Sequence, residues 1–141
     1  MFSRAQRSEI MRRIKSNNTK PERIIRTFLR KASIKVHSHD KHLAGKPDIV
    51  IPSLRRIVFV NGCFWHHHKG CKRATWPKSN SIYWKTKIKR NMARDEENLR
   101  QLKKAGWKTT ILWECEIDLI DTLPKIKRII QESVDHKTNH P

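Results

Sequence analysis

The chain has 141 residues, which fits one domain and allows a substantial hydrophobic core. Its 32 Lys and Arg residues outnumber 13 Asp and Glu residues, so the formal net charge is +19 at pH 7. This excess favours a polyanionic partner, because counterion release drives nucleic-acid binding, although a cationic surface can also serve solubility alone. The sequence contains neither a run of 18 apolar residues nor an apolar leader, which argues against a membrane span and a signal peptide. Three cysteines, an odd number, favour a reduced, cytoplasmic protein with thiols free for metal.

Residues 1–18 are predicted to form a basic helical arm. Ile10, Met11 and Ile14 make a short apolar stripe at helical spacing, surrounded by Arg and Lys residues. We therefore divide the chain into this arm, a single domain over residues 19–135 and a flexible tail over residues 136–141.

A second helix is predicted to begin at Thr19. Thr19 and Glu22 have the spacing of a capping box, and Pro21 lies in the first turn. The residues that follow supply an apolar face at helical spacing: Ile24, Ile25, Phe28 and Leu29.

Three short strands are predicted next. Ile34–His37 is the shortest, and Asp48–Ile51 and Arg56–Val60 are rich in β-branched residues and joined by a polar turn at Pro52–Arg55. Residues 62–80 contain Gly, Cys, His, Trp and Pro without periodicity. They are predicted to form an ordered loop that something other than an apolar core holds in place.

The remaining elements alternate between helix and strand. A long helix over residues 82–105 ends at Gly106, a buried strand covers Thr109–Trp113, and a last helix covers Thr122–Val134. The order of helices and strands predicts one mixed α/β domain with helices layered on a central sheet.

Three cysteines and a histidine run suggest a metal site. Cys63 and Cys71 bracket His66, His67 and His68, and Cys115 follows the last predicted strand. Three thiolates and one imidazole make the usual tetrahedral set of structural zinc, which would also explain an ordered loop. The alternative is that these are ordinary buried cysteines and surface histidines.

The carboxylates that could serve a phosphodiesterase are few. Asp48 follows Pro47 at the start of an apolar strand, where an acidic residue usually caps a turn or binds a ligand. The next strand, Ile57–Asn61, offers neither a carboxylate nor a lysine, so a catalytic base must come from elsewhere. His66 is the best candidate, and Asp95 on the long helix could orient it.

These residues together resemble a known family. The run Gly62–His68 (GCFWHHH), with Pro47-Asp48 before it, Arg94-Asp95 after it and Trp113-Glu114-Cys115 near the end, is similar to the very-short-patch repair (Vsr-type) DNA mismatch endonucleases. The similarity runs from about Arg7 to about Asp118. The Cys-Phe-Trp-His-His core is highly specific, whereas the Pro-Asp pair and the basic arm are not.

The resemblance implies a restriction-endonuclease-like fold with a structural zinc. It also implies Mg²⁺-dependent nicking of one DNA strand 5′ to the T of a T:G mismatch, the product of 5-methylcytosine deamination. The expected partner is double-stranded DNA in a bacterial cytoplasm, associated with the nucleoid, and downstream repair proteins are further candidates. Because one nick needs one active site, a monomer is the simplest expectation.

The resemblance also assigns roles to catalytic positions. Asp48 is expected to bind Mg²⁺, and His66 is expected to help activate the attacking water. Asp95 corresponds to a further acidic position of the active site, and Glu22 to a less central one.

Metal and DNA contacts follow in the same way. The expected zinc ligands are Cys63, His68, Cys71 and Cys115. Phe64 and Trp65 are expected to enter the base stack from the major groove, where an apolar insertion costs least at a mismatch. Met11 and Ile14 are expected to clamp the minor groove. The alternative is that the aromatic pair belongs to the core and that Met11 and Ile14 pack a helix.

Two departures from the family pattern stand out. Asn61 occupies a position where a second active-site histidine is expected, and Asn cannot take up a proton at neutral pH. The interval from Cys63 to Cys71 is about one residue longer than expected, which leaves His67 and His68 as alternative ligands, with His68 favoured.

Two other functions fit the same features. One is a restriction-type endonuclease of the same fold, which would cut fully paired duplex DNA. The other is a zinc-stapled DNA-binding module without catalysis, which would need no Mg²⁺ and would bind DNA without cutting it.

Overall fold

The computed structural model describes residues 19–38 and 40–139. The predicted arm, with Met11 and Ile14, lies outside the described residues. The elements in chain order are α2 (Lys20–Lys31), β1 (Ile49–Ile51), the 3-10 helix η1 (Pro52–Leu54), β2 (Arg56–Asn61), α3 (Ser81–Lys104), β3 (Lys108–Trp113), the 3-10 helix η2 (Glu114–Leu119) and α4 (Pro124–Asn139). Within this part of the chain, no helix combines the length and the apolarity that crossing a bilayer requires.

The sheet has the order β1-β2-β3. β1 pairs antiparallel with β2, with Ile49 opposite Val58, so β1 begins at the end of the sheet where β2 finishes. β2 and β3 are parallel, and their last residues, Asn61 and Trp113, are paired. The loops that carry the candidate site residues therefore leave the sheet at one common end.

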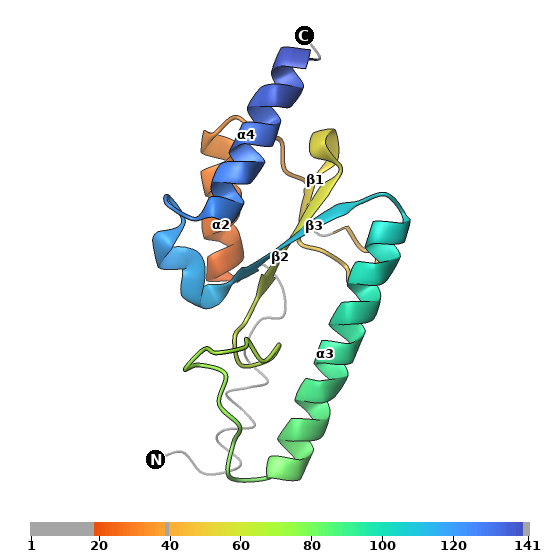
Figure 1. Ribbon diagram of the computed structural model, residues 1–141, viewed down its shortest axis with the longest axis vertical. Helices are drawn as coiled ribbons and strands as arrows, with labels where there is room; N and C mark the ends of the chain where they lie inside the picture. The colour runs from red at the N-terminus through yellow and green to blue at the C-terminus, as the bar shows by residue number, and fades with distance from the viewer. Residues whose placement is uncertain (1–18, 39, 140–141) are drawn as a thin grey trace.

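Helices cover both faces of the sheet, with α2 and α4 on one side and α3 on the other (Figure 1). The strand residues alternate between these faces, as a pleated strand requires. Ile49 and Ile51 pack into the larger core with α2 and α4, whereas Val50 and Ile57 pack with Leu102 of α3. The predicted mixed α/β architecture with a central sheet is confirmed.

The predicted start of α2 is confirmed by its capping box. The backbone N–H of Thr19 donates to Oε2 of Glu22 at 3.2 Å, and the N–H of Glu22 donates to Oγ1 of Thr19 at 3.5 Å. Ile25 and Leu29 are fully buried, and Ile24 and Phe28 pack against them. The cap fixes Glu22 in the first turn, where its side chain faces the protein interior.

Several sequence-based boundaries were wrong. The predicted strand Ile34–His37 reduces to a single antiparallel bridge between His37 and Val50. The last helix begins at Pro124, two residues later than predicted, and continues to Asn139, into the segment predicted as a tail. Val134, the last residue of the predicted helix, is 51% exposed, and Met92 on α3 is also exposed.

An ion-pair network fastens α4 to the first residues of β2 and β3. Arg56, which is buried, donates to both carboxylate oxygens of Glu132 at 3.2 and 2.5 Å, and Lys108 donates to the same carboxylate at 3.2 Å. Burial raises the pKa of Glu132, but the hydrogen bonds and charges of Arg56 and Lys108 outweigh burial and hold it below its usual value. The ionised form of Glu132 is therefore favoured in the folded state.

We expect Glu132→Gln to lower the free energy of unfolding at pH 7 by about 1–3 kcal/mol, because it leaves Arg56 buried without its ionic partner. Since the folded-state pKa is depressed, the contribution of Glu132 is present above its unfolded pKa and is lost as the pH falls through the folded value. Urea denaturation of both proteins from pH 7 down to pH 3 measures this difference, which should shrink in acid.

The matched control is Glu97→Gln. Glu97 pairs with Arg100 one helical turn away on the surface of α3, so its replacement should change stability little. Equal losses for the two variants would contradict the role of the Arg56–Glu132 pair.

Candidate functional site

Three cysteines and one histidine converge beyond the parallel ends of β2 and β3. Because Asn61 and Trp113 are paired, Cys63 and Cys115, each two residues further on, emerge side by side. A series of turns then returns the loop to the same point: the N–H of His68 donates to the carbonyl of Cys63 at 2.9 Å, and that of Cys71 donates to the carbonyl of His68 at 3.2 Å.

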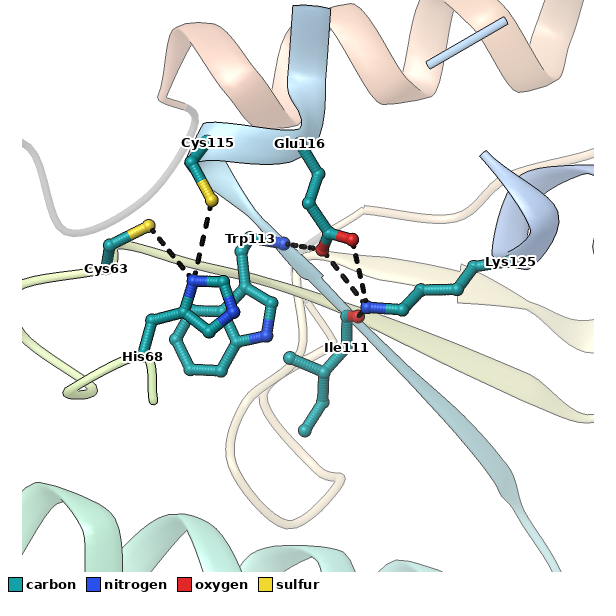
Figure 2. A network of polar contacts seen from close by, with 7 residues as sticks. All are labelled: Cys63, His68, Ile111, Trp113, Cys115, Glu116 and Lys125. Atoms are coloured by element: carbon teal, nitrogen blue, oxygen red, sulfur yellow. Dashed lines mark hydrogen bonds and ion pairs between the residues drawn. The ribbon is translucent and has the colours of Figure 1, made fainter. Parts of the chain in front are cut away.

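The donor atoms of Cys63, His68, Cys71 and Cys115 all lie within 4.8 Å of one another. Nδ1 of His68 is 3.7 Å from Sγ of Cys63 and 3.4 Å from Sγ of Cys115 (Figure 2). Burial raises the pKa of Cys63 to about 12, whereas hydrogen bonding from the backbone of Arg73 lowers the pKa of Cys71. Three sulfurs and one imidazole at this spacing fit a single tetrahedral metal ion.

The imidazole of His68 packs on Trp113, and Trp113 is in turn held by a network of polar contacts. The ring of His68 stacks on that of Trp113, with centroids 4.1 Å apart and planes 6° apart. The backbone N–H of Trp113 donates to Glu116 at 2.9 Å, and Lys125 of α4 donates to Glu116 at 3.0 Å and to the carbonyl of Ile111 at 2.9 Å (Figure 2). This network connects α4 to the position of the imidazole.

His67 faces elsewhere. Its backbone has a positive φ of 47°, and its ring lies against that of Trp76, with centroids 4.2 Å apart and planes tilted by 30°. Nδ1 of His67 is buried and has no hydrogen-bond partner among the described residues. Of the two alternatives that the sequence left open, the structure places His68 with the cysteines.

Glu114 contributes a contact that the sequence did not predict. Its Oε1 accepts a hydrogen bond at 3.1 Å from the backbone N–H of Cys63, across the gap between the two strand ends. The only sequence signal was its position directly before Cys115. Because Glu114 directly precedes Cys115, this contact links the backbone of Cys63 to the segment that carries Cys115.

A carboxylate pair lies at the same end of the sheet. Asp48 immediately precedes β1 and forms a hydrogen bond with Glu22 of α2, which is 3% exposed. Burial, followed by the hydrogen bond and the charge of Asp48, raises the pKa of Glu22 to about 7. Two adjacent carboxyl groups supply the oxygen ligands that Mg²⁺ prefers, so this pair could hold a divalent cation.

A second pair joins His66 to α3. Nδ1 of His66 lies 2.5 Å from Oδ2 of Asp95, and both side chains are about one-quarter exposed, at 25% and 29%. With its Nδ1 hydrogen donated to the carboxylate, the imidazole keeps Nε2 as an acceptor. A carboxylate that fixes the tautomer and the orientation of a histidine in this way leaves Nε2 placed to act as a general base.

Four aromatic rings connect the two residues before His66 to the first turn of α3. Phe64 and Trp65, which we call the aromatic wedge, lie 5.4 Å apart, and each is 5.8 Å from the ring of Trp84 on α3. Tyr83, 57% exposed, packs edge-on against Trp84 at 5.1 Å. Neither wedge residue is buried, which argues against the alternative that they belong to the core. Trp84 of α3 therefore packs on the wedge.

Comparison with known proteins agrees with these features. A family model described as DNA mismatch endonuclease Vsr matches residues 1–73.

The chain belongs to the Vsr family.

Curated relatives extend the similarity over the rest of the chain. The type II nicking enzyme V.XorIIP of Xanthomonas oryzae is 39% identical over 94% of this chain and 97% of its own length. The type II nicking enzyme V.NmeAIP of Neisseria meningitidis is 38% identical over 96% of each chain. The DNA mismatch endonuclease Vsr of Escherichia coli is 34% identical over 83% of this chain and 74% of its own length. Membership of the Vsr family makes this protein a DNA endonuclease of the kind that acts in DNA repair.

Asn61, the position at which the family resemblance leads us to expect a second histidine, lies at the end of the sheet that carries the candidate site. It is the last residue of β2, it is buried at 9% exposure, and it pairs with Trp113. The nearest histidine in the sequence is His66, five residues after Asn61. Its imidazole contacts Asp95 as described above.

Gly45 fixes the loop that delivers Asp48. It has a positive φ of 79°, and a Cβ at this position would lie 3.1 Å from the Phe59 ring and 3.2 Å from the side-chain amide of Asn98 on α3. The loop at Gly45 therefore packs closely between Phe59 of β2 and Asn98 of α3. The backbone reaches Asp48 three residues later.

We expect Gly45→Ala to destabilise the protein by more than the roughly 1–2 kcal/mol of left-handed backbone strain, because steric contact adds to it. Gly70→Ala is the matched control, since Gly70 has φ of 76° but nothing within 4 Å of an added Cβ. Chemical denaturation measures both, and an equal loss for the two variants would show that the Phe59 and Asn98 contacts are unimportant.

Proposed function

We propose that this endonuclease nicks one strand of duplex DNA 5′ to the T of a T:G mismatch, the lesion left by deamination of 5-methylcytosine. The observation that carries the proposal is the turn Phe64–His66, where two partly exposed aromatic side chains directly precede a histidine held by Asp95. The E. coli relative, which is named as a mismatch endonuclease, supports the same function.

The aromatic wedge provides a physical basis for sensing a mismatch. Insertion of a ring between base pairs costs a few kcal/mol of unstacking, and the cost is smallest where pairing is already weak. Trp84 braces both rings of the wedge from α3. In this proposal Met11 and Ile14 act from the minor groove, opposite the wedge.

The candidate catalytic groups divide the chemistry between them. Asp48, with Glu22 beside it, would hold Mg²⁺, and a bound Mg²⁺ would polarise the scissile phosphate. Nε2 of His66 takes a proton from the attacking water, and Asp95 stabilises the resulting imidazolium. The surplus of cations binds the DNA backbone and opposes charge repulsion between protein carboxylates and phosphate.

The Cys63, His68, Cys71 and Cys115 cluster is proposed to bind structural zinc. Its donor set leaves no open position for a substrate, and it fastens the base of the loop that carries the wedge and His66. We further propose that the domain has the restriction-endonuclease-like fold and acts as a monomer.

A restriction-type nicking enzyme is the second candidate. The relatives from Xanthomonas and Neisseria are named type II nicking enzymes. A function of that kind in this chain would appear as nicking of fully paired duplex.

The deciding experiment uses end-labelled duplexes that are identical except for one T:G or T:A pair, incubated with the protein and Mg²⁺ and resolved on a denaturing gel. The proposal predicts one nick 5′ to the mispaired T, absent with EDTA and absent on T:A. Equal cutting of both duplexes would favour the second candidate. Binding without cutting would indicate a non-catalytic module and direct attention to Asn61.

We expect Asp48→Asn and His66→Ala each to reduce the nicking rate by about 100-fold or more, since positioned acid–base groups contribute on that scale. Single-turnover rates on the T:G duplex measure the loss, and thermal unfolding checks that both variants fold. Asp40→Asn is the control, because the Asp40 side chain makes a local contact with the N–H of His42. Wild-type rates for either catalytic variant would remove that residue from the mechanism.

We expect His68→Ala and Cys115→Ser to lose bound zinc and much of the stability of the fold, because metal binding contributes directly to folding. His67→Ala should retain zinc, since its ring faces Trp76 and not the cysteines. Metal analysis and thermal unfolding of the purified proteins test this. Full zinc occupancy in Cys115→Ser would refute the ligand set.

A further inference from the structure

Helix α3 contacts the turn at Trp65 and His66 through two side chains on one face. The side-chain amide of Asn91 donates from Nδ2 to the backbone carbonyl of Trp65 at 3.1 Å. Asp95 contacts Nδ1 of His66 at 2.5 Å. Residues four apart on a helix lie above one another on the same face, so one rigid element holds two consecutive residues of the turn.

A third residue orients the amide of Asn91. Nη2 of Arg94 donates to Oδ1 of Asn91 at 2.8 Å. Because this contact engages the oxygen, the NH₂ group is directed to Trp65 and the two ends of the amide are not interchangeable. Two successive hydrogen bonds therefore link Arg94 to Asn91 and Asn91 to the carbonyl of Trp65.

The two contacts on the turn are not equivalent. Asp95 restrains the imidazole ring of His66, whereas Asn91 restrains the peptide group that joins Trp65 to His66. Without the second restraint, the backbone of Trp65 could shift while the His66 ring stayed on Asp95. With it, the wedge and the histidine move as one unit.

We propose that Asn91, oriented by Arg94, is a positioning residue that keeps the aromatic wedge and His66 in register, so that insertion of Trp65 at a mismatch aligns His66 for catalysis. This inference rests on the proposed function of the wedge and of His66. Asn91 and Asp95 on α3 would thereby couple recognition of the lesion by the wedge to the chemical step at His66.

The test replaces the donor while preserving its shape. Asn91→Asp cannot donate to the Trp65 carbonyl, and Gln101→Ala removes an amide on the same helix whose contact, with Glu97, is local and exposed. We expect Asn91→Asp to lower kcat on the T:G duplex by about 10-fold, the effect of one lost hydrogen bond, with KM within about 2-fold of wild type. Gln101→Ala should leave both unchanged.

A readout without DNA separates this inference from the proposed function. Amide hydrogen exchange of the free protein should be faster at residues 64–68 in Asn91→Asp and normal in Gln101→Ala, whether or not the wild type proves to nick T:G. Unchanged exchange, or a defect confined to KM, would overturn the inference and indicate that Asn91 contacts DNA directly. If Asn91→Asp fails to fold, Arg94→Ala should show the same exchange signature at reduced size, and its absence would equally overturn the inference.

Discussion

The parallel pairing of β2 with β3 is the constraint on which the site depends. Its register sets Asn61 against Trp113 and so delivers Cys63 and Cys115 to one point from distant parts of the sequence. A parallel pair also requires a long crossover, and here that crossover contains the loop 62–80 and α3. The same topological requirement therefore places α3 where Asn91 and Asp95 meet the turn that follows β2.

The elements with strong local signals were predictable from sequence. The capping box at Thr19 and the glycine after α3 set two helix boundaries correctly, because each signal satisfies backbone groups within its own segment. Ile34–His37 failed as a strand because only His37 finds a partner in the sheet. The last helix passed its predicted end since no Gly or Pro interrupts residues 135–139, although its outer face there is polar.

Residue chemistry predicted the members of the site but not their partners. Sequence spacing could not show which of His67 and His68 points toward the cysteines. Their orientations depend on the left-handed backbone at His67 and on the packing of His68 against Trp113 at the end of β3. The position of Trp84 in the predicted long helix did not show that its ring contacts the aromatic wedge, because that contact depends on how the loop 62–80 folds back onto α3. The contact of Glu22 with Asp48 depends on how α2 docks against β1, which only tertiary packing determines.

The interval from Cys63 to Cys71, which is about one residue longer than the family resemblance leads us to expect, includes an exposed bend. Lys69 and Gly70 are both exposed, and the space around the Gly70 Cα is open. Outside the bend, the N–H of His68 donates to the carbonyl of Cys63, and the N–H of Ala74 donates to the carbonyl of Cys71. The hydrogen bond from Cys71 to His68 closes this bend, so an added group is better carried by the exposed side chain of Lys69 than inserted into the backbone, which makes Lys69 a suitable point for attaching a fluorophore.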